Sequence, residues 1–167
     1  YFTLQGTQRK KNLKKQAFSF QISIRDPSTL ADVFIPEIRR LSPGTIEGNF
    51  DSDKQTLNAN IDIPEVVYND VRVDSLRVKV TSDPDLLHAA VSVKSISDSM
   101  FRVTNLQLVG KAGHDSVEIA LKSTRSDGST RMLLAGIFNS VPDGYKFRFN
   151  QDGIVFQNLP WSVPSDN

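Results

Sequence analysis

The sequence contains no cysteine, no long apolar run and none of the common catalytic signatures. Without cysteine there are no disulfides, thiolate nucleophiles, cysteine zinc sites or cysteine-ligated iron–sulfur clusters. No apolar stretch approaches the roughly 18 residues of a membrane-spanning helix. The P-loop, the dinucleotide-binding fingerprint and the G-x-S-x-G elbow are missing as well. We therefore do not expect an enzyme.

Metal-binding patterns are also lacking. The two histidines, His88 and His114, have no ligand-type neighbour at the spacing that zinc sites use. His88 is out of phase with the apolar residues beside it, so we expect it to face solvent, and His114 lies in a turn. The aspartates do not follow the EF-hand pattern, and turn chemistry explains Asp51, Asp53, Asp83, Asp85 and Asp127. We expect no metal and no cofactor.

What the sequence does contain is ordinary globular composition with an uneven charge. Its 167 residues are 38% hydrophobic and 23% charged, which indicates one domain or a piece of a longer chain. The net charge is +1, but residues 1–15 hold five cations and no acid, so residues 16–167 carry −4. This acidic body argues against nucleic acid as a partner. We divide the chain into a basic segment, 1–15, and a domain, 16–167.

Alternating apolar residues dominate that domain. Phe18, Phe20, Ile22 and Ile24 alternate with polar residues, which predicts a strand with one buried face. One short helix is expected over about 27–41, because Pro27 suits a first helical position and apolar residues follow at spacings of three and four. Within it, Arg39 and Arg40 would complement the helix dipole. The remaining strands are expected at 45–50, 55–63, 71–80, 86–94, 100–109, 116–122, 131–138, 144–150 and 153–157.

From residue 45 onward the apolar pattern recurs about every thirty residues. Each unit is two antiparallel strands with one apolar face, and such a hairpin gains stability by stacking on its neighbours. The apolar phase changes between Val73 and Leu76, and again thirty residues later, which predicts a bulge or kink at Asp74-Ser75 and at Thr104-Asn105. A regularly bent sheet with its apolar side inside would result. Whether this side is closed into a filled sandwich or barrel, or stays open as a trough, is not decided by these residues.

Three segments resemble the TamB family of Bacteroidetes-like bacteria: FIPEI at 34–38, LSPGTIEGNFD at 41–51 and FQNLPWSV at 156–163. That family is related to the AsmA-like group and to bridge-like lipid-transfer proteins. The resemblance implies a long periplasmic chain anchored in the inner membrane, a curled, taco-like β-sheet, transport of phospholipid, and an outer-membrane partner of the Omp85 class. It implies no catalytic residue. The chain begins with Tyr1 and shows no signal peptide, so we expect an internal fragment or a processed product.

These observations together predict an all-β domain with one short α-helix, built from antiparallel hairpin repeats into a curled, taco-like sheet. We expect it to be a segment of a periplasmic lipid conduit that binds phospholipid acyl chains along its apolar side. The alternative is a non-catalytic secreted adhesion or scaffold β-sandwich with a filled core. An isolated domain would also be able to dimerise edge to edge or face to face. The expected lipid-lining residues are Ile46, Phe50, Leu57, Ile61, Leu76, Val78, Leu87, Val91, Phe101, Leu106, Leu108, Val117, Ile119, Leu121, Phe138, Phe147, Phe149, Phe156 and Trp161.

Overall fold

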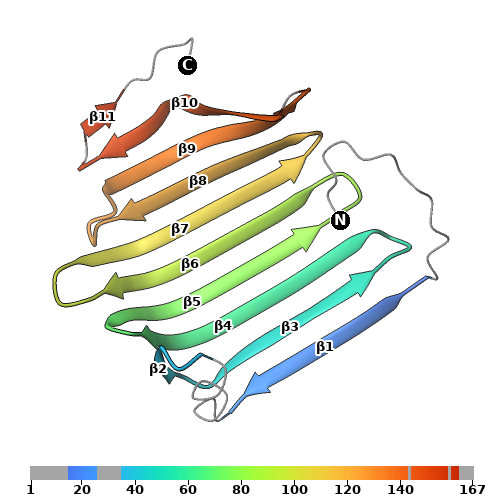
Figure 1. The fold of residues 1–167 in the computed structure, drawn as a ribbon, viewed down its shortest axis with the longest axis horizontal. Coiled ribbons are helices and arrows are strands. Elements are labelled where there is room, and N and C mark those ends of the chain that lie inside the picture. Colours follow the sequence, from blue (N-terminus) through green and yellow to red (C-terminus); the bar gives the residue numbers. More distant parts are fainter. Residues whose placement is uncertain (1–14, 26–34, 143, 158, 162–167) are drawn as a thin grey trace.

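The protein forms a single open antiparallel sheet, as seen in a computed structural model that describes residues 15–25, 35–142, 144–157 and 159–161. Figure 1 shows the strands side by side, with β1 along one edge and β10 and β11 along the other. In these described ranges the eleven strands are β1 (Ala17–Ile24), β2 (Ile38–Leu41), β3 (Gly44–Asp51), β4 (Thr56–Tyr68), β5 (Val71–Ser82), β6 (Leu87–Ser97), β7 (Arg102–Gly113), β8 (Ser116–Thr124), β9 (Thr130–Val141), β10 (Gly144–Phe156) and β11 (Leu159–Trp161).

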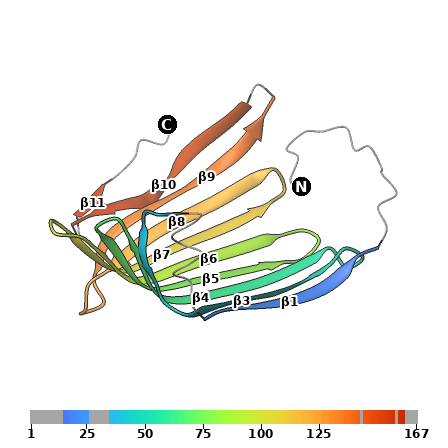
Figure 2. The same ribbon diagram turned by 60° about the horizontal axis from the view of Figure 1, so that its bottom comes forward.

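The strand order follows the sequence almost without exception. From β3 to β11 each strand pairs with the next one along the chain, β1 adds to the free side of β3, and β2 pairs with the far end of β4. The sheet does not close, and Figure 2 shows that it is twisted, with β9 and β10 rising away from the plane of β1 and β3. A twist of this kind is the normal state of an open sheet.

Tight turns that are stabilised by aspartate side chains join many of the strands. Asp83 Oδ1 accepts hydrogen bonds from the backbone N–H groups of Asp85 and Leu86, both at 2.9 Å. Asp51, Asp98 and Asp127 hold their own turns in the same way. The hydrogen bond from the Asp85 N–H is the largest cause that lowers the pKa of Asp83 below its ordinary value. Of the aspartates noted in the sequence, Asp51, Asp83 and Asp127 therefore stabilise turns through their side chains, as expected from their chemistry.

The predicted helix over 27–41 is wrong where it can be compared with the structure. Residues 27–34 lie outside the described residues, but Ile38–Leu41 is strand β2. A register shift between Ile38 and Arg40 in the pairing with β4 leaves Ile38 and Leu41 partly buried and the two arginines between them exposed. An apolar spacing of three therefore arises here from a bulge rather than from a helical turn. Arg39 and Arg40 form ion pairs with Asp70 and Glu65 instead of facing a helix end.

The strands after residue 44 were predicted at their observed places, with ends that differ by a few residues. The exceptions come last: β11 was not predicted, and 144–150 and 153–157 belong to one strand, β10. Its pairing with β9 shifts register between Phe149 and Ile154, so one bulged strand had the pattern of two.

The predicted kinks at Asp74-Ser75 and Thr104-Asn105 are confirmed. Ser75 has φ 54° and Asn105 has φ 49°, both in the left-handed region. Ladder pairing is interrupted at both residues, yet the pairs on either side keep one register, so the kinks are made without an inserted residue. Beyond the kinks the apolar residues again form one cross-strand row, through Leu41, Val66, Val73, Ile96 and Val103.

The described residues contain no second layer that would cover either face of the sheet. The extensive contacts between elements are all contacts between neighbouring strands. Val93, 6% exposed, is the one apolar side chain in the described residues that is buried. The filled β-sandwich that we considered as an alternative is therefore not the architecture of this part of the chain. The basic segment was expected to be separate; residues 1–14 lie outside the described residues, and Lys15 pairs with Asp53 at 2.8 Å.

Candidate functional site

The candidate site is one face of the sheet, on which apolar residues of neighbouring strands stand in rows. Directly paired residues of antiparallel strands project to the same side, so the register defines each row. We call this side the apolar face. Its central row crosses ten strands without a polar residue, through Ile22, Ile46, Ile61, Val78, Val91, Leu108, Leu121, Leu134, Ile154 and Trp161.

Three further rows flank the central row. One contains Phe20, Gly48, Ala59, Val80, Ala89, Gly110, Ile119, Gly136 and Phe149. The next contains Phe18, Phe50, Leu57, Ser82, Leu87, Ala112, Val117, Phe138 and Phe147. The row on the other side contains the pairs Ile24–Gly44 and Ile63–Leu76 and continues through Val93, Leu106, Ser123, Met132, Phe156 and Leu159.

No charged residue occurs in these four rows, and the two polar side chains in them are engaged by backbone. Ser123 is fully buried and its hydroxyl donates to the carbonyl oxygen of Thr104 at 2.8 Å. The Ser82 hydroxyl oxygen accepts a hydrogen bond from the Leu57 N–H at 2.8 Å. Neither serine adds a free polar group to the face, so its chemistry is that of hydrocarbon.

The row that contains Gly48 and Gly136 also holds Ala59, Ala89 and Gly110, so five of its nine residues are glycine or alanine. Near the centre of the sheet a depression of about 190 Å³, which we call the furrow, lies around Gly110, where a methyl group would have no atom closer than 4.0 Å. Aromatic rings fill the space at the two outer glycines of the row, since Phe20 covers Gly48 and Phe147 covers Gly136. The middle of the face is therefore hollow and the two ends are filled.

Two aromatic clusters form those ends. On the β1 side the ring centroids of Phe18 and Phe50 are 5.6 Å apart. On the β10 side Phe147 lies 4.5 Å from Phe138 and meets Phe149 edge-on at 4.9 Å. Such pairs add about 0.5–1.5 kcal/mol each beyond the area that they bury. The clusters stabilise the outer strands without closing the centre.

The structure brings together all the predicted lining residues except Phe101. Phe101 lies before β7, where its carbonyl oxygen accepts a hydrogen bond from the Asp98 N–H, and it belongs to none of the four rows. The prediction omitted β1, although Phe18 and Ile22 are 54% and 52% exposed on the same face. The alternation of residues 18–24 was the available signal, but it does not say which strand lies beside β1.

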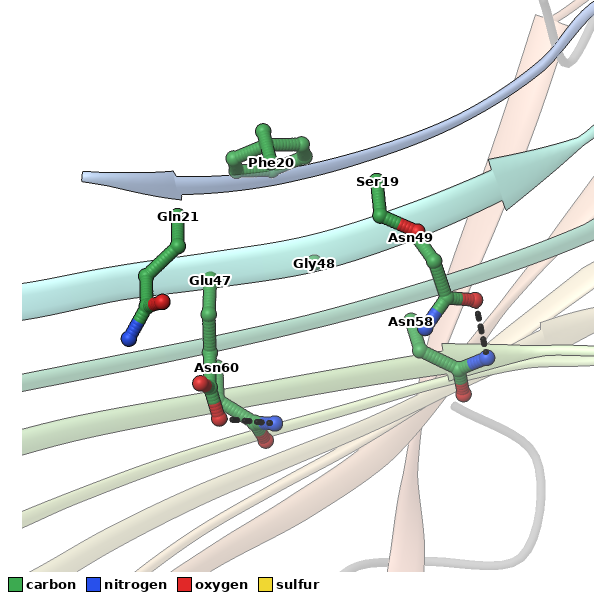
Figure 3. Close-up of a pocket in the computed structure, with 8 residues that line it drawn as sticks. All are labelled: Ser19, Phe20, Gln21, Glu47, Gly48, Asn49, Asn58 and Asn60. Carbon is green, nitrogen blue, oxygen red and sulfur yellow. Dashed lines mark hydrogen bonds between the residues drawn. The ribbon is translucent and has the colours of Figure 1, made fainter.

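The opposite face is polar along most of its length. Figure 3 shows a shallow depression there, in which Asn58 donates to Asn49 and Asn60 donates to Glu47, while Phe20 points away to the apolar side. The depression has a volume of about 430 Å³ and open sides. His88 lies in the same polar row, opposite Thr81 and Lys111, as its phase predicted. The polar side chains of this face are therefore solvated without the need for a binding partner.

A network of charges lies at the kinked end of the strands. Glu65 pairs with Arg40 and Arg72, and Arg72 also bonds Asp74 at 2.8 Å. The buried Ser95 hydroxyl donates to Asp74 Oδ2 at 2.6 Å, and this bond is the largest cause that lowers the pKa of Asp74, ahead of Arg72. The network fixes the rim of the sheet and leaves the apolar face free of charge.

The described residues include no group of three potential metal ligands and no helix long and apolar enough to cross a membrane. Comparisons with family models, with curated proteins and with solved structures gave no match to this chain. The function must therefore be argued from the geometry of the apolar face.

Proposed function

We propose that the apolar face binds hydrocarbon chains, above all the acyl chains of phospholipids, and that this chain is a segment of a periplasmic lipid conduit. The single observation that carries the proposal is the uncharged central row, which crosses ten strands and stays accessible on a one-layer sheet. At about 4.8 Å between strands this row is roughly 43 Å long. Soluble monomers rarely expose an apolar surface of this extent unless something binds there.

The energetics suit an acyl chain. Each methylene taken out of water contributes about 0.8 kcal/mol, so a 16-carbon chain offers on the order of ten kcal/mol before ordering costs. Because the apolar face presents no charge and no free hydroxyl, it offers nothing specific to a headgroup, which would remain at the charged rim. Binding of this kind is passive and needs no catalytic residue or cofactor.

The proposed conduit also requires curvature. We propose that the twist, together with the kinks at Ser75 and Asn105, bends this sheet into the taco-like trough of the TamB-like proteins that the sequence resembles. In that arrangement the furrow around Gly110 runs along the trough floor. A location in the periplasm, an inner-membrane anchor and an Omp85-class partner follow from the same resemblance and are part of this proposal.

The proposal predicts that the protein purified from cells carries phospholipid, which mass spectrometry of an organic extract detects. The sharper experiment is photo-crosslinking to a lipid with a reactive acyl chain. Leu108 and Val109 are neighbours on β7 with similar exposure, 39% and 48%, but they face opposite sides of the sheet. Leu108→Glu should lower crosslinking by about tenfold or more, because it places a charge where a chain would lie. Val109→Glu should leave crosslinking within about twofold.

Thermal melting separates this outcome from a stability effect. Both variants should melt close to the wild type, because neither side chain is buried in the described structure. If Leu108→Glu instead unfolds the domain, the face is covered by protein rather than open to lipid, which contradicts the proposal. Equal crosslinking of the two variants would also contradict the proposal.

A further inference from the structure

The two edges of the sheet are protected very differently against pairing with another strand. The last edge is formed by β11, three residues long with Pro160 at its centre, and by the first part of β10, which carries Lys146 and Arg148. Short strands, prolines and charges are the usual devices that block edge pairing. The first edge, β1, has none of them, since residues 16–24 contain no charge, no proline and no glycine.

The free side of β1 presents regularly spaced backbone groups. The Ser52 N–H donates to the carbonyl oxygen of Gln16 at 2.8 Å, and the Gln16 N–H donates to the Ser52 hydroxyl oxygen at 2.7 Å, so both backbone groups of Gln16 point toward Ser52 as in a hydrogen-bonded pair. Because such pairs alternate along an antiparallel ladder, the even-numbered residues of β1 bond to β3. The N–H and C=O groups of Ala17, Ser19, Gln21 and Ser23 therefore point to the open edge, where no described strand receives them.

We propose that β1 is a dimerisation edge, and that its occupant is the β1 strand of a second copy of this chain, paired antiparallel about a two-fold axis. The strand is complementary to itself. In a register centred on Gln21, Phe20 opposes Ile22 of the second copy and Phe18 opposes its Ile24, all on the apolar face. Ser19 opposes Ser23 on the polar face. The uncharged strand meets no electrostatic repulsion in this pairing.

The symmetry has a consequence for the apolar face. A two-fold axis perpendicular to the sheet leaves the apolar faces of both copies on the same side. The rows that end at Phe20 and Ile22 in one copy then continue in the next copy, so the dimer is one continuous sheet with a doubled apolar surface. This pairing does not depend on what the face binds.

A single proline tests the pairing without disturbing the fold. The Gln21 N–H points outward, so Gln21→Pro removes an edge donor but keeps every bond to β3. Gln21→Ala retains the N–H and is the matched control. Analytical ultracentrifugation in a non-ionic detergent, which covers the apolar face, should give twice the 18.6 kDa mass for the wild type and for Gln21→Ala. Gln21→Pro should weaken association by about tenfold or more.

The absence of cysteine permits an independent check of geometry. Gln21→Cys should form a disulfide-linked dimer on oxidation, whereas Thr81→Cys, on the same polar face but in β5, should not. A wild-type monomer at all concentrations overturns the proposal. So does a dimer that survives Gln21→Pro and is lost in Leu108→Glu, because that result places the contact on the apolar face rather than at β1. Neither result depends on lipid crosslinking, which tests the proposed function separately.

Discussion

The two faces of this sheet are made by the same strands and differ in how complete they are. On the polar face Arg77 bonds Asp62 and Asn58 bonds Asn49, so side chains there satisfy one another or water. On the apolar face Leu108, Leu134 and Phe138 are each 39% exposed, although nothing polar compensates for their contact with water. The side chains of the polar face are therefore hydrogen-bonded or solvated in the described chain. The apolar side chains remain in contact with water in the described chain, and the proposed function rests on this exposure.

The contrast weakens toward the later strands. The polar-face row that begins with Gln21, Glu47, Asn60 and Lys79 continues through Ala90, Val109, Ala120 and Ala135. Small apolar residues therefore enter the middle of this face, between rows that keep Glu118 and Lys122. The distinction between the faces depends on absence of charge from one of them, rather than on polarity at every position of the other.

The largest expected effect on stability is that of replacing Gly136 by alanine, compared with the same replacement of Gly110 in the same row of the apolar face. Gly136→Ala should destabilise the protein by about 1–3 kcal/mol, because the added methyl would lie 2.5 Å from a Phe147 ring atom and 2.6 Å from the Arg148 carbonyl oxygen. Gly110→Ala should be neutral or stabilise by about 0.5 kcal/mol, since its methyl enters the open furrow and alanine loses less entropy than glycine. Urea unfolding measures both.

This pair distinguishes an open face from a covered one. If Gly110→Ala destabilises the protein as much as Gly136→Ala, something already fills the furrow, and the apolar face is not open at Gly110. The aromatic lids over Gly48 and Gly136 remain in either case, because Phe20 and Phe147 belong to the described sheet.

A smaller effect is expected at the kink that keeps the apolar phase consistent. Ser75 has a left-handed backbone, which costs an L-residue about 1–2 kcal/mol and costs a β-branched residue most. Ser75→Val should therefore lower the free energy of unfolding by about 1–2 kcal/mol, and Ser75→Gly should not lower it. Ser92→Val is the control, because Ser92 has ordinary strand geometry where valine is favoured. Equal effects at both sites would mean that the kink is not strained.

Much of the fold could be read from the sequence because strand alternation is a local property. The turns at Asp51, Asp83 and Asp127 and the kinks at Ser75 and Asn105 were predicted because each depends on a few adjacent residues. The helix over 27–41 failed because Ile38 and Leu41 follow a spacing that a bulged strand also produces. Only the pairing with β4, about 25 residues away in sequence, decides between the two.

The residues of the site could be predicted from the sequence, but whether they are exposed or covered could not. Alternation placed nearly all the lining residues on one side, whereas the absence of a covering layer among the described residues depends on all the strand pairings together and leaves no mark on any one strand. Phe101 was included because it repeats Val71 thirty residues later, but the chain at Phe101 is part of a turn held by Asp98. The furrow was missed because the glycines and alanines that form it carry little hydrophobic signal.

The smallest expected effect concerns two buried serines, Ser95 and Ser123, which are 2% and 0% exposed. Ser95 donates to Asp74 and holds the pKa of that carboxyl below its ordinary value of 3.8, whereas Ser123 donates to a backbone carbonyl. A lowered pKa in the folded state stabilises the protein above pH 3.8, and this stabilisation is lost as the pH falls through the folded-state pKa. Ser95→Ala should lower the free energy of unfolding by about 0.5–1.5 kcal/mol at pH 7. The deficit should shrink as the pH falls below 3.8, because protonation removes the charge that Ser95 stabilises.

The deficit of Ser123→Ala should not change between pH 7 and pH 3, since the Thr104 carbonyl does not titrate. Urea unfolding at the two pH values measures both deficits, and parallel behaviour of the variants would show that the bond to Asp74 contributes nothing that depends on charge.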